Sequence, residues 1–262
     1  MTEHRAGKPR RIGFSALAAI AATLTGLLTV GSTEQLFTAE TGGDRYAAFA
    51  HIPWLALGWC AAFAVMVRGA AARPAAMQQV LAMLAGLYLG GLVLARESDP
   101  VFYLGFGVVV GLLVVLHPAR AAVFRPGETG VSPLMLVLSL VALAPLILYT
   151  VRLIDLTEST NGEGPFYTGI AGAALSVPLV GLAASLRARG ARLPGWTAAI
   201  MLAFVGVGSL AFDDPGSLSP FRAVAALVGA VAFAVVTERD SRQGGPRSRV
   251  EPPGETRQKA LQ

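Results

Sequence analysis

The stretch Leu134-Met-Leu-Val-Leu-Ser-Leu-Val-Ala-Leu-Ala-Pro-Leu-Ile-Leu-Tyr-Thr-Val151 carries no charged side chain. A helix needs about 20 mostly apolar residues, and at least about 17, to cross the hydrocarbon core of a bilayer. The stretch meets this length, with Ser132 and Pro133 before it and Arg152 after it. It therefore predicts a membrane-spanning helix.

Seven further apolar runs have the same character. They are Ile12–Val30, Ala47–Val67, Met77–Ala95, Val101–Leu116, Tyr167–Leu186, Trp196–Phe212 and Phe221–Val236. The runs that start at Val101 and Phe221 fall short of the usual length, so either their ends are extended by snorkelling side chains or one of them is re-entrant. The pattern predicts an all-α integral membrane protein with eight transmembrane helices.

The overall composition agrees with a bilayer as the solvent. Apolar residues make up 54% of the chain and charged residues 14%, against about 25% charged residues in soluble domains. The net charge of +5 would also suit nucleic acid. However, the basic residues lie in the gaps between the apolar runs and build no continuous face. We therefore expect the lipid bilayer as a partner and no nucleic acid.

The positions of the arginines orient the predicted helices. Only Arg45, Arg96, Arg152 and Arg222, among 21 basic residues, lie in the connections on one side. Since Lys and Arg are retained in the cytoplasm, both termini are predicted to be cytoplasmic. The abundance of Ala, Gly and Arg suggests a bacterial plasma membrane. A cleaved signal peptide would leave seven helices, but the first apolar run is longer than such peptides have.

The two halves of the chain resemble each other. Arg68 and Arg73 match Arg187 and Arg192 at one constant offset, and each pair follows the second helix of its half. Two parallel four-helix repeats would explain this, although alternating basic and acidic connections give any protein with an even number of helices a similar look. The predicted organisation is a cytoplasmic N-terminus (residues 1–11), a first four-helix unit (12–116), a cytoplasmic linker (117–133), a second four-helix unit (134–236) and a disordered cytoplasmic tail (237–262).

Glycines spaced four residues apart predict close helix contacts. They are Gly86 with Gly90, and Gly107 with Gly111. Because glycine has no side chain, such a spacing lets two helix backbones approach each other. We expect packing within the bundle from these pairs, and an oligomer interface is the alternative.

Acidic residues in the predicted outer connections are candidate binding residues. Asp213 and Asp214 would bind a divalent cation through carboxylate oxygens, or serve as acid and base on a lipid-linked sugar. Alternatively, Asp214 before Pro215 would cap a helix start, as would Asp99 before Pro100. The capping interpretation is favoured, and under it Asp214→Asn should leave insertion and expression nearly unchanged.

Three further residues complete the candidate binding set. His51 is either an interfacial residue bonded to a loop or a ligand that titrates near neutrality. Arg96 and Arg222, on the side that is poor in arginine, would pair with carboxylates or hold an anionic group. His51 and His117 are predicted on opposite sides of the membrane and Cys60 is the one cysteine, so we expect no haem, other cofactor or metal.

Three classes of function stay open. The first is a non-catalytic membrane component, a partner subunit or sensor, bound to another membrane protein or to copies of itself; it fits the absence of catalytic motifs. The second is a transporter of small solutes or lipids, suggested by the repeat and by Pro145 and Pro178 inside predicted helices. The third is an enzyme at the outer face that acts on a lipid-linked substrate.

Overall fold

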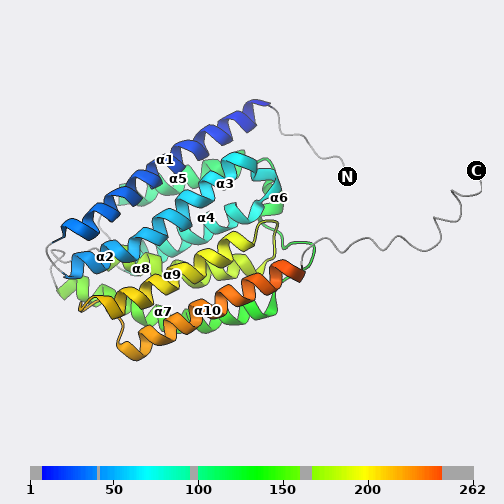
Figure 1. Cartoon of the computed structure of the whole chain (residues 1–262). Helices are drawn as coiled ribbons and strands as arrows, with labels where there is room; N and C mark the ends of the chain where they lie inside the picture. Colours follow the sequence, from blue (N-terminus) through cyan, green and yellow to red (C-terminus); the bar gives the residue numbers. More distant parts are fainter. Residues whose placement is uncertain (1–7, 40–41, 95–99, 160–166, 244–262) are drawn as a thin grey trace, which may run out of the picture.

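The computed structural model describes residues 8–39, 42–94, 100–159 and 167–243, and all regular elements in this part of the chain are helical. The helices lie side by side in one elongated bundle (Figure 1). Their bounds are α1 Lys8–Thr38, α2 Gly42–Pro53, η1 Trp54–Ala61, α3 Ala62–Gly69, η2 Ala70–Ala72, α4 Pro74–Leu87, η3 Tyr88–Leu94, α5 Pro100–Leu116, α6 Arg120–Val123, α7 Pro133–Ser159, α8 Tyr167–Ser185, α9 Arg192–Ala211 and α10 Pro220–Gln243.

Six helical segments are long and apolar enough to cross a membrane. They are Lys8–Thr38, Asp44–Gly69, Pro133–Glu158, Tyr167–Ser185, Arg192–Ala211 and Pro220–Gln243. The all-helical fold and a set of membrane-length helices are therefore confirmed. The last segment reaches this length because α10 continues past Val236 to Gln243. Within the described residues, α5 and the segment 74–94 fall outside the set.

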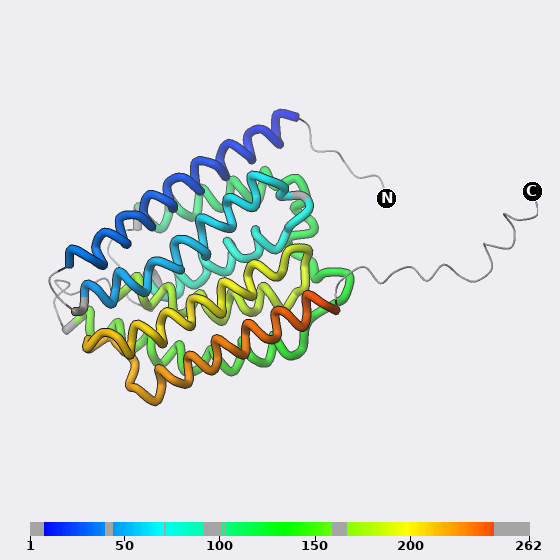
Figure 2. The backbone as a smooth tube through the Cα atoms, viewed as in Figure 1, coloured from blue at the N-terminus to red at the C-terminus, as the bar shows by residue number. Residues whose placement is uncertain are grey.

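Alternate helix ends gather at the two ends of the bundle. One end, here the arginine-rich end, carries Arg10, Arg68, Arg73, Arg187, Arg189, Arg192 and Arg239. The other, here the acidic end, carries Glu34, Asp44, Asp155, Glu158, Asp213 and Asp214. Figure 2 shows that the first residues of α1 and the last residues of α10 both lie at the arginine-rich end.

The bundle has buried inner helices and exposed outer ones. α8 packs against α4, η3, α7 and α9, and α9 packs in turn against α10 and α2. The outer helices α1, α5, α7 and α10 expose large apolar side chains, among them Ile12, Leu27, Leu104, Val141, Leu148 and Val228. Soluble proteins rarely expose apolar surface on this scale, so the exterior suggests a protein surrounded by lipid.

Glycines let the backbones of the two halves of the chain approach each other closely. A Cβ at Gly90 would lie 2.6 Å from the backbone nitrogen of Gly172 on α8, and a Cβ at Gly86 would lie 2.7 Å from that of Ser176. The predicted close contact of the first glycine pair is thus confirmed within the bundle. Gly111, in the second pair, faces open space.

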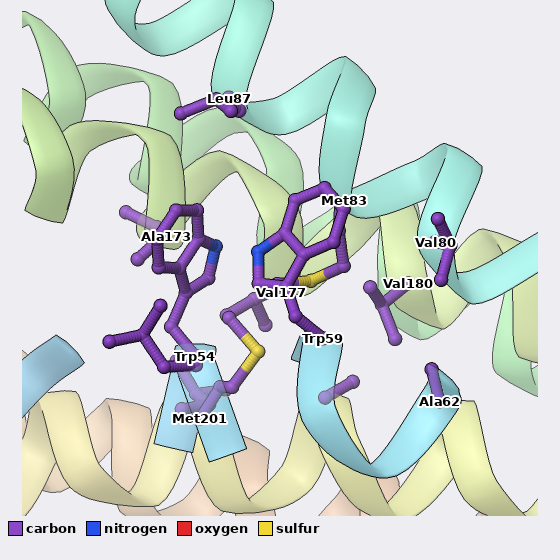
Figure 3. Close-up of a cluster of buried hydrophobic side chains, with 14 of the residues drawn as sticks. Trp54, Trp59, Ala62, Val80, Met83, Leu87, Ala173, Val177, Val180 and Met201 are labelled. Atoms are coloured by element: carbon purple, nitrogen blue, oxygen red, sulfur yellow. The ribbon is translucent and has the colours of Figure 1, made fainter. Parts of the chain in front are cut away.

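Large side chains fill the space between the halves midway along the bundle. Trp59, Met83 and Val177 are fully buried, and Trp54 is nearly so. The two indole rings meet edge to face with their centroids 5.9 Å apart, and Figure 3 shows both rings among Met83, Val177 and Met201. The halves are therefore joined by a packed core at this depth.

Gln79 on α4 anchors a stretch of wider helix. η1 is a π-helix, a form that differs from the α-helix in its hydrogen-bond spacing and is rare beyond a single turn. The side-chain amide of Gln79 donates to the carbonyl oxygens of Leu57 at 2.7 Å and Gly58 at 2.9 Å, and its oxygen accepts from the Thr197 hydroxyl at 3.4 Å. Gln79 is fully buried, so one side chain joins η1, α4 and α9.

Arg10 and His117 fasten α1 to α5 at the arginine-rich end. The Arg10 guanidinium donates to the carbonyl oxygens of Val115 at 2.6 Å, Leu116 at 3.3 Å and His117 at 3.2 Å, which are orphan acceptors at a helix C-terminus. The His117 ring is fully buried and its Nδ1 accepts from the Ala119 N–H at 3.1 Å. Burial lowers the pKa of His117 to about 4, and the charge of Arg10 acts in the same direction.

This histidine should make the stability of the protein depend on pH. The ordinary pKa is 6.5, so the folded state favours the neutral ring. Its contribution to stability is complete above pH 6.5 and is lost as the pH falls from 6.5 to about 4. We expect the unfolding temperature in detergent to fall more steeply over this interval for the wild type than for His117→Asn, which keeps an acceptor but does not titrate. Parallel curves would contradict the prediction.

Candidate functional site at the acidic end

Asp214 lies in the connection between α9 and α10 and is 7% exposed. Its Oδ1 accepts from the backbone N–H of Gly216 at 2.7 Å, and its backbone oxygen accepts from the Ser217 hydroxyl at 2.7 Å. The Tyr167 hydroxyl on α8 lies 3.2 Å from both carboxylate oxygens. Because α10 begins only at Pro220, Asp214 closes a turn and does not cap that helix, which corrects the capping interpretation.

A chain of hydroxyl groups continues from this turn into the bundle. The Tyr149 hydroxyl on α7 donates to the backbone oxygen of Gly216 at 2.9 Å and is in close contact with the Tyr46 hydroxyl on α2. The Tyr46 hydroxyl lies 3.3 Å from Ser209 Oγ, which accepts from the Leu218 N–H at 2.9 Å. Since Tyr149 spends its one proton on Gly216, Tyr46 donates to Tyr149 and Ser209 donates to Tyr46.

Arg152 holds the same turn from the outside. Its guanidinium donates to the backbone oxygens of Pro215 at 2.7 Å and Ser217 at 3.3 Å. We call the set Tyr46, Tyr149, Arg152, Tyr167, Ser209 and Asp214 the outer clasp. The outer clasp ties α2 of the first half to three helices of the second half, α7, α8 and α9, and to the connection that follows α9.

His51 lies on the same helix as Tyr46 but in a different environment. Its Nδ1 is 2.8 Å from the backbone oxygen of Ala47, one turn earlier, and so donates to it. Its Nε2 lies against α8 at Gly169, where a side chain would find no room. The ring also meets Trp54 edge to face at 5.9 Å. His51 therefore packs into the contact between α2 and α8.

The remaining candidates do not join a common pocket with Asp214. Asp213 and Arg222 are both exposed, the latter in the first turn of α10. Arg96 and Asp99 lie outside the described residues. In the part of the chain that the structure describes, no group of three or more His, Cys, Asp or Glu side chains could hold a metal ion. Of the four candidates that the structure describes, Asp214 is the one that belongs to the outer clasp.

Sequence reasoning missed the tyrosines of the outer clasp. Three of the five tyrosines of the chain, Tyr46, Tyr149 and Tyr167, lie near the ends of predicted apolar runs that face the side poor in arginine. Tyrosine is enriched at membrane–water interfaces, where the ring is buried and the hydroxyl finds a polar partner. The position of these tyrosines at the predicted interface was the signal available in the sequence. The pairing of the hydroxyls depends on how four elements pack, which no local pattern encodes.

The chemistry of the outer clasp is that of a structural fastening. The carboxylate of Asp214 is buried and occupied by a hydroxyl and an N–H group, and the guanidinium nearby is spent on backbone oxygens. A general acid–base pair needs contact with a substrate proton, whereas these groups face one another. A scan of protein-family models finds no match to the chain, and neither does a search of curated proteins or of solved structures.

The contacts of Asp214 change the expectation for Asp214→Asn. An amide offers one acceptor oxygen where the carboxylate offers two, and it loses the charge that strengthens both bonds. We expect a loss of about 1 to 2 kcal/mol in the free energy of unfolding. Asp213→Asn, one residue away and exposed, is the matched control and should change it by less than about 0.5 kcal/mol. Equal losses in the free energy of unfolding for the two variants would mean that the buried carboxylate of Asp214 contributes no more to stability than the exposed one of Asp213.

Proposed function

We propose that this chain is a non-catalytic component of a bacterial plasma membrane, a partner subunit or sensor with eight transmembrane helices and both termini in the cytoplasm. The single observation that carries the proposal is the packed core between the halves. Trp54, Trp59, Met83 and Val177 fill the depth at which a transporter with parallel repeats would hold its cargo. The non-catalytic class needs no such opening.

Two observations support eight crossings. α5 and the segment 74–94 lie in the same bundle as the six longer helices, and they run between the same two ends (Figure 1). The side chains on α5 at Leu104, Val108 and Val115 are exposed and apolar, which suits lipid. Orientation follows from the arginine-rich end, because Lys and Arg are retained on the cytoplasmic side.

The packing pattern supports the proposed repeat. The first half has four helical segments in chain order: α1, then α2 with η1 and α3, then α4 with η3, then α5. α4, in the third segment, packs on α8, the second helix of the second half. Reciprocally, α2, in the second segment of the first half, packs on α9, the third helix of the second half. An axis along the membrane normal would exchange these two contacts. The first and fourth helices of each half then lie outermost.

The two other classes lack comparable support. A transporter must alternate between arrangements of its halves, but the backbone contact at Gly90 and the outer clasp both oppose such a motion. An outer-face enzyme would need Asp213, Asp214 and His51 in one pocket, but the first is exposed and the others are used in internal contacts.

Distances between spin labels test whether the halves move. Cys60 is the one native cysteine, so Cys60→Ser provides the background. One double variant, Glu34→Cys with Asp213→Cys, measures the distance between the halves at the acidic end. A second double variant, Arg68→Cys with Arg239→Cys, measures the distance between the halves at the arginine-rich end. All four positions are exposed. We expect one narrow distance distribution for each pair in detergent, in lipid nanodiscs, and in sealed lipid vesicles with or without a pH gradient.

A pair within one half, Asp213→Cys with Arg239→Cys, serves as the control for rigid-body behaviour. If one inter-half distance shortened while the other lengthened, and the control pair stayed constant, the halves would alternate. That result would replace the proposed function with a transporter.

A further inference from the structure

A cavity of about 330 Å³ opens at the arginine-rich end. It lies between the connection that precedes α7, the connection between α8 and α9, and the last turns of α10. Its lining includes Thr129, Arg187, Arg189, Gly190 and Arg192. Three arginines of one short segment therefore converge on a single concave surface, which we call the arginine pocket.

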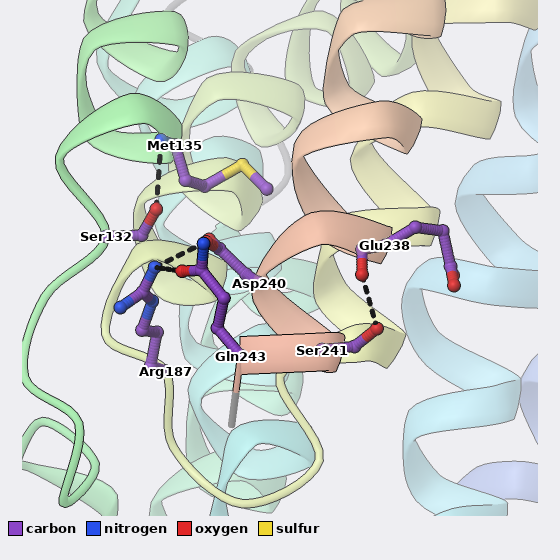
Figure 4. Close-up of polar contacts among 7 residues, drawn as sticks. All are labelled: Ser132, Met135, Arg187, Glu238, Asp240, Ser241 and Gln243. Atoms are coloured by element: carbon purple, nitrogen blue, oxygen red, sulfur yellow. Dashed lines mark hydrogen bonds and ion pairs between the residues drawn. The ribbon is translucent and has the colours of Figure 1, made fainter. Parts of the chain in front are cut away.

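The backbone of this segment is shaped for that convergence. Gly190 has φ +89° and Arg187 has φ +48°, and a left-handed conformation is uncommon for a residue with a side chain. The strain is maintained by the Arg187 guanidinium, which contacts Asp240 closely and lies 3.3 Å from the Gln243 side-chain oxygen (Figure 4). Both Arg187 and Asp240 are mostly buried, so this ion pair is part of the fold.

The other two arginines that line the pocket, Arg189 and Arg192, form more exposed ion pairs. Arg189 lies 3.2 Å from Glu128, but their side chains are 75% and 89% exposed, and such a pair contributes at most about 1 kcal/mol. Arg192 bonds Glu238, which also accepts from the Trp196 indole at 2.7 Å. The pocket is thus lined by guanidinium groups that an incoming anion can engage.

A fourth arginine comes from the corresponding connection of the first half. A Cβ at Gly190 would lie 3.3 Å from the Cβ of Arg73, and Arg73 is exposed. The Ala75 N–H also lies 3.4 Å from the backbone oxygen of Arg189. Arg73 therefore lies beside Gly190 without being part of the pocket lining, and it adds a positive charge next to the ion pairs Arg189–Glu128 and Arg192–Glu238.

Two buried atoms of the Arg187–Asp240 ion pair beside the pocket have no hydrogen-bond partner among the described residues. Arg187 Nε and Asp240 Oδ2 are inaccessible, and neither has a hydrogen-bond partner in the described part of the chain. Because both atoms are inaccessible, the guanidinium groups that an anion in the pocket can reach are those of Arg189 and Arg192, whose side chains are 75% and 63% exposed.

Retention of arginine on the cytoplasmic side does not by itself produce this geometry. That tendency counts charges near a helix end and is met equally by Arg68, which is exposed at the end of α3 and does not line the pocket. Convergence on a cavity is a separate property. We infer that the arginine pocket binds a phosphate-class anion, with Arg189 and Arg192 as the ligands of its oxygens.

The anion has two chemical sources, a phospholipid headgroup and a free phosphate. Guanidinium groups bind phosphate oxygens through paired hydrogen bonds. At the end of a membrane bundle they also lie at the level of anionic lipid headgroups. Trp196, beside Arg192, has the amphipathic character of an interfacial residue. The site does not depend on whether the halves of the protein move.

Ligand-dependent thermal stability of the full chain tests the inference. The protein in a neutral detergent is heated with increasing inorganic phosphate at constant ionic strength, or with phosphatidylglycerol against phosphatidylcholine. An anion that binds only the folded state stabilises it by RT ln(1 + c/Kd) at free concentration c, so the unfolding temperature rises with the anion concentration and the dependence gives the apparent affinity. We expect stabilisation by at least one probe, and an apparent affinity about tenfold weaker in Arg189→Gln, which removes a paired contact worth about 1.4 kcal/mol.

Arg68→Gln is the matched control, because it removes one exposed charge at the same end of the bundle without touching the pocket. It should weaken binding less than about twofold, as expected for screened charges. Arg189→Lys keeps the charge but loses the paired geometry and should fall between the wild type and Arg189→Gln. Stabilisation by phosphatidylglycerol alone assigns a lipid headgroup, and stabilisation by phosphate alone assigns a free anion. Response to neither probe, or equal losses in Arg68→Gln and Arg189→Gln, would overturn the inference.

Discussion

Replacing Gly90 with alanine is expected to lower the free energy of unfolding by about 3 kcal/mol or more. The new Cβ would lie 2.6 Å from the backbone nitrogen and 2.7 Å from the Cα of Gly172. Rotation of a side chain cannot relieve a clash between two backbones. The helices that carry these glycines must separate, and the packed core beside them opens.

The matched control is Gly111→Ala, in the second glycine pair. Nothing lies within 4 Å of a Cβ there, and alanine favours a helix over glycine by about 1 kcal/mol. This variant should be as stable as the wild type or slightly more so. Unfolding curves in mixed micelles measure both changes. If Gly90→Ala unfolded together with Gly111→Ala, η3 and α8 would not be in backbone contact.

Replacing Gln79 with leucine is expected to cost about 3 kcal/mol. Leucine matches glutamine in size but leaves the carbonyl oxygens of Leu57 and Gly58 without their donor, and it removes the acceptor of Thr197. Buried hydrogen bonds between membrane helices contribute about 0.6 to 1.7 kcal/mol each. The lost bonds act together, because all depend on one side chain in a site that water does not reach.

Gln35→Leu is the control for the same chemical change on an exposed helix surface. It should leave the free energy of unfolding within about 0.5 kcal/mol of the wild type. A small effect of Gln79→Leu in the same assay would mean that the wide turns of η1 are satisfied without α4. The comparison also reports on the junction between halves, because Thr197 lies on α9.

Hydropathy located the helices of this chain well but did not locate their ends. The first run was expected over Ile12–Val30, whereas α1 covers Lys8–Thr38, and α10 continues through charged residues to Gln243. An apolar run reflects the hydrocarbon layer, whereas a helix continues as long as its backbone hydrogen bonds do. Residues beyond the apolar core, such as Arg10, stay helical and bond the end of another helix.

The polar contacts between helices were beyond the reach of a local pattern. Asp214 was recognised because two acids precede a proline, yet its bond to Tyr167 joins positions far apart in the chain. The π-helices η1 and η3 were not expected, since their sequences look like any other apolar run. In both cases the deciding partner, Tyr167 or Gln79, comes from a neighbouring helix.

We propose that lipid surrounds this bundle and that its arginine-rich end faces the cytoplasm. Single cysteines at Asp213 and at Arg189, placed in the Cys60→Ser background and treated in intact cells with a membrane-impermeant maleimide, test it most directly. We expect Asp213→Cys to react in intact cells and Arg189→Cys to react only after the membrane is permeabilised. Labelling of Arg189→Cys in intact cells, or recovery of the protein in the soluble fraction without detergent, would contradict it.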